Sequence, residues 1–74
     1  MNRRKAKFQW HANSVYGCYT AHLCDASGKR YATVLWEGKE AHAYMVDDNG
    51  SSLYLGHFPD TVVAKAEARR RLEI

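Results

Sequence analysis

The sequence predicts an α+β fold, a four- to five-stranded antiparallel meander with one C-terminal helix packed on one face. Turn residues recur at regular intervals along the chain, at Ser27-Gly28, Gly38-Lys39 and Asn49-Gly50. The runs between them are rich in Tyr, Val, Thr and Leu, which favour strands. An alanine-rich segment of helical periodicity follows Pro59. Because 74 residues suffice for one small core, we expect a single domain over residues 1–74.

The first expected strand lies at residues 8–12, where apolar Phe8 and Trp10 alternate with polar side chains, and Asn13-Ser14 is the expected turn after it. The stronger strand candidates are residues 16–25, 30–37, 41–47 and 52–58. The sheet therefore occupies residues 8–58, after a basic N-terminal arm at residues 1–7. It is followed by a helix at residues 60–73.

Several residues support that helix. Asp60 or Thr61 can accept a hydrogen bond from the free N–H groups of the first turn. Ala64, Ala68 and Leu72 follow at the i, i+4, i+8 spacing of one helix face. Three arginines at 69–71 lie near the C-terminus, where positive charge suits the helix dipole, and a solvated helix end explains them.

Turn lengths combined with side-chain alternation predict the register, because a slip of one residue would move every side chain of a strand to the other face. A two-residue turn at Ser27-Gly28 pairs Leu23 with Ala32, Ala21 with Val34 and Tyr19 with Trp36. A two-residue turn at Gly38-Lys39 pairs Trp36 with Ala41, Val34 with Ala43 and Ala32 with Met45. A three-residue loop at residues 48–50 pairs Met45 with Leu53 and Ala43 with Leu55. The competing two-residue turn at Asn49-Gly50 would place Val46 opposite Leu53.

This register gives the sheet two different faces. The aliphatic face, which the helix should cover, comprises Tyr19, Ala21, Leu23, Ala32, Val34, Trp36, Ala41, Ala43, Met45, Leu53 and Leu55. The opposite face carries Thr20, His22, Cys24, Tyr31, Thr33, Leu35, His42, Tyr44, Val46, Ser52 and Tyr54. The second set is too aromatic for a merely solvated surface, and so it is the candidate binding face.

A row on the second face, from His22 through Thr33 and Tyr44 to Tyr54, offers flat rings with hydrogen-bonding tips. Sheets with such rings and nearby cations bind single strands or groove edges of nucleic acid. The candidate contacts are Arg3, Arg4, Lys5, His22, Lys29, Arg30, Tyr31, Thr33, His42, Tyr44 and Tyr54. Two alternatives remain open: Phe8 and Trp10 cover this face as a second small core, or the face binds a protein.

Composition supports a nucleic-acid partner without requiring one, because the net charge is +3. No apolar run approaches the roughly 20 residues that cross a bilayer, and the basic start lacks the apolar core of a signal peptide. We therefore expect a cytoplasmic protein with no membrane partner. Cys18 and Cys24 lie on one expected strand with α-carbons about 20 Å apart, too far for a disulfide.

The polar residues predict no enzyme, metal or cofactor. The chain has four histidines and two cysteines, but none of its cysteines has the C-x₂₋₄-C spacing typical of structural zinc sites. His22 and Cys24 are neighbours on one face, yet no third catalytic group or oxyanion hole accompanies them. Residues 47–50 resemble a fragment of a calcium loop without its bidentate glutamate, so they are better interpreted as a hairpin turn.

The last third of the chain resembles the end of small sheet-plus-helix DNA-binding domains. Leu55-Gly56-His57-Phe58, then Thr61 and the alanines of residues 64–68, are similar to plant ethylene-response-type domains and to the arm-binding domains of tyrosine recombinases. The resemblance implies a sheet whose face away from the helix enters the major groove. Those families read DNA with arginines on that face, where this chain has Tyr, His and Thr. The size also resembles phage or prophage inhibitors, including anti-CRISPR proteins.

Two functions follow as hypotheses. The first is a small non-enzymatic module that binds nucleic acid through the aromatic sheet face and the basic arm. The second is a phage- or mobile-element-type inhibitor or adaptor that binds a host protein through the same face. An exposed edge strand also allows a homodimer.

Overall fold

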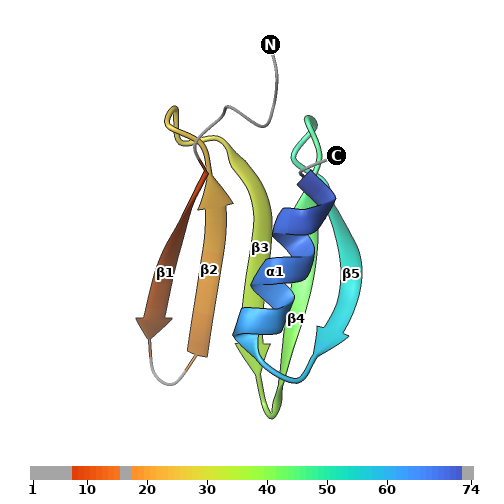
Figure 1. Cartoon of the computed structure of the whole chain (residues 1–74). Coiled ribbons are helices and arrows are strands. Elements are labelled where there is room, and N and C mark those ends of the chain that lie inside the picture. Colours follow the sequence, from red (N-terminus) through yellow and green to blue (C-terminus); the bar gives the residue numbers. More distant parts are fainter. Residues whose placement is uncertain (1–7, 16–17, 73–74) are drawn as a thin grey trace.

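The computed structural model describes residues 8–15 and 18–72, which form five strands and one helix (Figure 1). The strands are β1 (Gln9–Val15), β2 (Cys18–Cys24), β3 (Arg30–Glu37), β4 (Glu40–Val46) and β5 (Ser52–Phe58), and the helix is α1 (Thr61–Leu72). Neighbouring strands pair antiparallel in chain order. The predicted meander with one packed helix is confirmed. The arm at residues 1–7 and the expected helix end at residue 73 lie outside the described residues.

The first strand is longer than predicted. β1 continues through Asn13 and Ser14, which pair with Thr20 and Tyr19 of β2, so the expected turn at these residues is wrong. Asn and Ser favour turns only locally, and here β2 supplies a partner strand along the whole length of β1. The second strand begins at Cys18, and residues 16–17 lie outside the described part of the chain.

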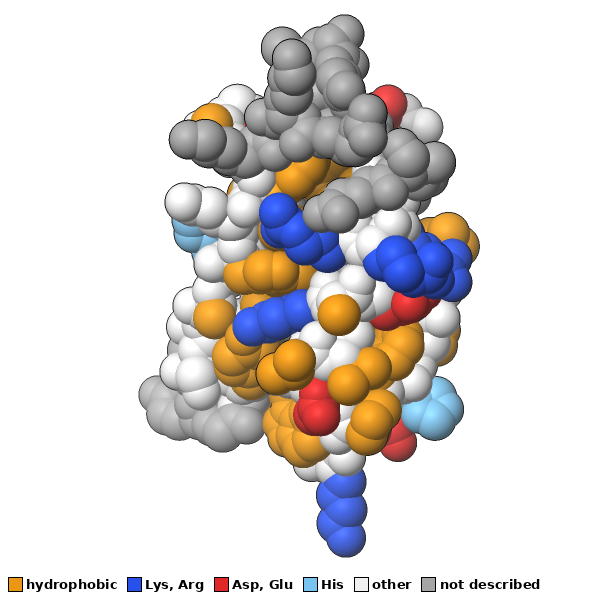
Figure 2. All heavy atoms as spheres, in the orientation of Figure 1, with side chains coloured by type: hydrophobic (Ala, Val, Ile, Leu, Met, Phe, Trp, Pro, Cys, Tyr) orange, Lys and Arg blue, Asp and Glu red, His pale blue; other side chains and the backbone are white. Residues whose placement is uncertain are grey.

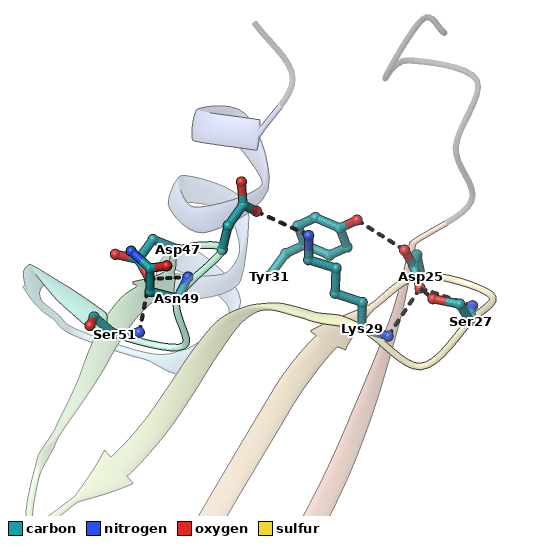
Figure 3. A network of polar contacts seen from close by, with 8 residues as sticks. Asp25, Ser27, Lys29, Tyr31, Asp47, Asn49 and Ser51 are labelled. Atoms are coloured by element: carbon teal, nitrogen blue, oxygen red, sulfur yellow. Dashed lines mark hydrogen bonds and ion pairs between the residues drawn. The ribbon is translucent and has the colours of Figure 1, made fainter.

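Two hairpin loops at the same end of the sheet have the same construction. In each, an aspartate, Asp25 or Asp47, accepts hydrogen bonds at Oδ1 from the backbone N–H groups two and four residues later, over 2.8 to 3.0 Å. The glycine three residues after it, Gly28 or Gly50, has positive φ and donates its N–H to the aspartate carbonyl. Lys29 Nζ lies 3.0 Å from Asp48 Oδ1 and joins the two loops (Figure 3).

Asp25 also accepts hydrogen bonds from the Ser27 and Tyr31 hydroxyls, at 2.6 and 2.9 Å (Figure 3). The Ser27 hydroxyl is the largest of the influences that lower the pKa of Asp25 from 3.8 to about 2. A carboxyl whose pKa is depressed on folding stabilises the fold above its unfolded pKa and loses that contribution as the pH falls through its folded pKa.

We therefore expect the stability difference between the wild type and Asp25→Asn to shrink as the pH falls from about 5 to about 2. Urea unfolding of both proteins across this range measures the difference at each pH. The pKa of Glu67 is also lowered, chiefly by its hydrogen bond with Arg70. Because Glu67 is present in both proteins, its contribution cancels when the free energy of unfolding of the variant is subtracted from that of the wild type. A difference that stays constant over the range would contradict the assignment.

The predicted pairs beyond the first two turns are confirmed, but the expected two-residue turn at Ser27-Gly28 is wrong, because the Asp25 N–H donates to the Lys29 carbonyl at 3.1 Å and closes a three-residue loop at residues 26–28. Leu23 pairs with Ala32 and Tyr19 with Trp36 across β2 and β3, while Trp36 pairs with Ala41 across β3 and β4. A bulge near Cys24 shifts the register by one residue, because Cys24 pairs with Arg30 and not with Tyr31. Tyr31 packs against the core beside Phe8, with ring centroids 5.2 Å apart. Its predicted place on the opposite face is therefore wrong.

The register predicted for the third loop is correct only near the turn. Met45 pairs with Leu53 and Tyr44 with Tyr54, but Ala43 then pairs with Gly56, so the predicted pairing of Ala43 with Leu55 is wrong. Leu55 is the extra residue of a second bulge. Gly56 has a φ of +135°, a conformation that side chains bearing a Cβ rarely adopt. In a regular strand, residues three positions apart project to opposite faces. Because of this bulge, Leu55 and Phe58 both pack into the core.

The core lies between the sheet and one side of α1. Ala64, Ala68 and Leu72 of the helix are buried against the sheet, as their spacing predicts. The helix begins where Asp60 Oδ1 accepts a hydrogen bond from the Val63 N–H at 2.8 Å. The fully buried sheet residues are Ala21, Leu23, Ala32, Val34, Ala41 and Ala43. Small side chains on both surfaces let the helix approach the sheet closely.

The N-terminal aromatic residues belong to this same core. Phe8 and Trp10 pack against the cluster of Leu23, Ala68 and Leu72. Trp10 also faces Leu23 across the β1–β2 ladder, on the helix side of the sheet. The alternative in which Phe8 and Trp10 cover the opposite face is therefore wrong.

The helix does not cover the whole sheet. Its backbone lies against β3, β4 and β5 but not against β1 or β2, as Figure 1 shows. Beside it, Lys65 Nζ lies 5.6 Å from the Trp10 ring centroid and 5.0 Å from that of Tyr19, and Arg69 lies over Phe8. Figure 2 shows basic and hydrophobic side chains mixed in this region. These cations cover aromatic rings that the helix leaves uncovered.

Candidate functional site

We call the side of the sheet away from α1 the outer face. Strand pairing aligns five of its residues in one line across all five strands, which we call the central row: His11, His22, Thr33, Tyr44 and Tyr54. A parallel second row comprises Asn13, Thr20, Leu35, His42 and His57. Every member of the central row is at least partly exposed, and Tyr54 is 49% exposed.

Hydrogen bonds and ring contacts hold the rings of these rows in place. His22 Nδ1 lies 3.0 Å from Thr33 Oγ1, and His42 Nδ1 lies 2.8 Å from the Tyr54 hydroxyl. The Tyr54 ring centroid is 5.2 Å from that of Tyr44 and 5.8 Å from that of His42, and the rings are tilted in both pairs. Side chains held in this way lose less conformational entropy when a ligand binds.

Burial and neighbouring charges shift the pKa values of two residues of the central row, His22 and Tyr54. Desolvation, and then the positive charge of Arg30, lower the pKa of His22 below its usual 6.5. Desolvation, and then Tyr44 and Glu40, raise the pKa of Tyr54, so its hydroxyl keeps its proton. His22 and Tyr54 therefore offer neutral rings with hydrogen-bonding groups at neutral pH.

Charged groups divide between the two ends of the outer face. Arg30 is close enough to His22 to influence its pKa, and Lys29 lies in the neighbouring loop. At the other end, Glu40 Oε2 lies 3.1 Å from His57 Nδ1 and 3.8 Å from His42 Nε2, and Glu40 pairs with Glu37 across the β3–β4 turn. Both ends therefore carry mixed charge, because Asp25, Asp47 and Asp48 lie with Arg30 and Lys29 at the loop end, and Lys39 lies with Glu37 and Glu40 at the turn end.

The structure brings most of the predicted site residues together. His22, Thr33, Tyr44 and Tyr54 form the central row with His11, and His42 lies beside Tyr54. Lys29 lies at the loop end, with its ammonium 5.2 Å from the Tyr31 ring centroid. Tyr31 itself lies on the helix side of the sheet, so it is not part of the outer face. Arg3, Arg4 and Lys5 lie outside the described residues.

Two histidines of the outer face were missed. His11 extends the central row to β1, and the alternation of residues 8–12 already indicated that it faces away from Trp10. His57 pairs with His42 because of the bulge at Leu55. The feature of the sequence that could have indicated this bulge is Gly56. With these two, all four histidines of the chain lie on the outer face.

Within residues 8–15 and 18–72, no group of three or more His, Cys, Asp or Glu side chains could hold a metal ion. Cys18 and Cys24 are free thiols. The part of the chain described here also contains no helix of the length and apolar character needed to cross a membrane.

Three comparisons with known proteins, by family model, by curated sequence and by solved structure, gave no match, so the functional argument depends on the residues of this chain.

Proposed function

We propose that the protein is a small non-enzymatic module that binds single-stranded nucleic acid through its outer face, with the basic arm contacting the phosphate backbone. The observation that carries the proposal is the central row, which crosses five strands without interruption and ends in the exposed ring of Tyr54. Rings that lie on an open sheet stack on bases of any sequence, because every base has a flat face.

The point at which the arm joins the sheet supports an orientation for the ligand. Arg30 and Lys29 lie at the loop end of the sheet, and β1 begins at the same end, where Gln9 pairs with Cys24. The arm, with Arg3, Arg4 and Lys5, is therefore joined to the sheet at the end that carries these two cations. Glu37 and Glu40 at the opposite end disfavour phosphates there.

Fluorescence anisotropy with labelled oligo(dT) and oligo(U), and with a duplex, tests the proposal. We expect binding of the single strands at about 25 mM salt, and an affinity that falls as salt rises. Arg3→Ala/Arg4→Ala/Lys5→Ala should weaken binding and reduce the salt slope by about 2, because each contact with a phosphate of a single strand contributes about 0.7.

The matched control removes three cations elsewhere. Lys39 lies in the β3–β4 turn, and Arg70 and Arg71 are paired with Glu67 on the helix. Lys39→Ala/Arg70→Ala/Arg71→Ala changes the net charge equally but should have a smaller effect on the slope. Undetectable binding at low salt, or equal losses in the two triple variants, would refute the proposal.

A second candidate is an inhibitor or adaptor of the phage or mobile-element type that binds a host protein through the outer face. The observation in its favour is that the face combines Leu35 and tyrosines with carboxylates at the turn end, a mixture that suits a protein partner better than a polyanion. A partner that remains bound after nuclease treatment and is lost with Tyr54→Ala would support this candidate. The arm variant should then have little effect.

A further inference from the structure

β1 is an edge strand with an unusually open edge. It pairs with β2 over seven residues without any shift of register, and no described strand lies beyond it. Its sequence, Gln9-Trp10-His11-Ala12-Asn13-Ser14-Val15, contains no Lys, Arg, Asp, Glu or Pro. Natural sheets usually protect an edge with charges, proline, a bulge or a very short strand. β1 has none of these.

The other edge strand provides the contrast within the same sheet. β5 carries the bulge at Leu55 and the positive φ of Gly56, which interrupt its regular pairing geometry. Pro59 follows directly after it. The two edges are therefore different, and only β1 offers a straight, uncharged row of backbone donors and acceptors.

The position of the helix leaves space beside the open edge. The backbone of α1 lies against β3–β5, so the helix side of β1 and β2 has no second layer among the described elements. Ala12 and Ser14 are exposed there, and Trp10 is half-buried. A second molecule can approach this edge without meeting a helix (Figure 1).

We propose that β1 pairs antiparallel with β1 of a second copy of the chain and forms a continuous ten-stranded sheet. Identical strands pair antiparallel around a two-fold axis perpendicular to the sheet, and this operation keeps each face on its own side. Paired residues must project to the same face, so the axis passes through a residue and not between two residues.

An axis through Ala12, the midpoint of β1, overlaps all seven residues. His11 then faces Asn13 of the second copy, and Trp10 faces its Ser14. The helices of the two copies lie on the same side of the sheet. They are separated by four strands that carry no helix, more than about 25 Å at a strand spacing of about 4.8 Å.

The dimer would join the two outer faces into one surface, because His11 at the end of each central row lies opposite Asn13 in the second row of the other copy. This inference does not depend on nucleic-acid binding, since it concerns the edge of the sheet and is measured with the protein alone. Its failure would therefore leave the proposed function untouched.

Sedimentation equilibrium over about 1 to 500 µM protein tests the proposal, because mass action links the assembly of a dimer to protein concentration. We expect the mass to rise from one chain to two. Ala12→Lys places like charges opposite each other at the axis and should raise the dissociation constant by about tenfold or more. The matched control is Leu53→Lys on β5, where Leu53 is 65% exposed. It should leave the constant within about twofold of the wild type. Monomers at every concentration, or equal sensitivity to the two substitutions, would overturn the proposal.

A cross-linking experiment removes the dependence on how well a lysine variant folds. Ala12→Cys, in a chain that also carries Cys18→Ser and Cys24→Ser, places two thiols opposite each other at the axis. Residues paired across an antiparallel ladder have α-carbons about 4.5 to 5.5 Å apart, within the range of a disulfide. Mild oxidation should give a covalent dimer, and Leu53→Cys in the same background should not. No cross-link from position 12, or an equal yield from position 53, would contradict the β1 interface.

Discussion

Replacing Tyr54 with alanine should weaken the binding of a single-stranded oligonucleotide by about 5- to 150-fold, the equivalent of about 1 to 3 kcal/mol for one stacked base. Tyr54 is 49% exposed, and its ring contacts both Tyr44 and His42. Its loss removes a stacking surface and leaves its two ring neighbours without support. The same anisotropy titration that tests the proposed function measures the effect.

Two controls separate the ring from other effects of the substitution. Tyr54→Phe keeps the ring but removes the hydroxyl that lies 2.8 Å from His42 Nδ1, so it should retain most of the affinity. Leu53→Ala alters the neighbouring residue, which pairs with Met45 on the helix side, and should leave binding unchanged. Equal affinity of Tyr54→Ala and the wild type, or an equal loss with Leu53→Ala, would argue against base stacking on this face.

Replacing Leu23 with alanine should reduce the free energy of unfolding by about 2 to 5 kcal/mol. Leu23 is fully buried and, with Val34, is one of the two largest side chains with no exposed surface. It packs with Ala32, Ala68 and Leu72, so its truncation leaves a cavity between helix and sheet that small neighbours cannot fill. In a domain of marginal stability, this loss is a large share of the total.

Urea unfolding followed by circular dichroism measures the loss. Leu53→Ala removes the same number of atoms from a leucine that is 65% exposed, and should change stability by no more than about 0.5 kcal/mol. Similar losses in the two variants would mean that the core described here does not hold the sheet and the helix together.

The register near the second and third turns could be predicted from local chemistry, whereas the loop before Lys29 is one residue longer than predicted. The turn at Gly38-Lys39 and the loop that ends at Gly50 determine which residues face each other, and alternation extends the pairing from there. The pairs of Leu23 with Ala32 and of Met45 with Leu53 were obtained in this way. Alternation fails where a strand contains an extra residue, and this chain has two such places.

Both bulges change which side chains project to each face of the sheet. The bulge near Cys24 moves Tyr31 to the core, where its hydroxyl reaches Asp25, and the bulge at Leu55 moves His57 to the outer face. A bulge forms because the core accommodates more apolar side chains than strict alternation allows. This depends on space beneath the helix, which the local sequence does not reveal.

The candidate site was predicted in its centre and not at its margins. His22, Thr33, Tyr44 and Tyr54 are members of one row because three correct registers place them there. Whether this row is exposed depends on where Phe8 and Trp10 pack. Side-chain alternation alone allows them to pack on either face of the sheet. Burial against Leu23 and the helix placed them on the helix side.

The order and type of the elements, and the aliphatic face of the sheet, follow from the chain itself, because turn residues and side-chain alternation act over a few neighbouring positions. The two bulges, the side taken by the N-terminal aromatic residues and the open edge at β1 depend on contacts between residues far apart in the sequence. The small alanines of α1 bring the helix close to β3–β5. The volume beneath the helix then determines which rings are buried in the core and which stay on the outer face.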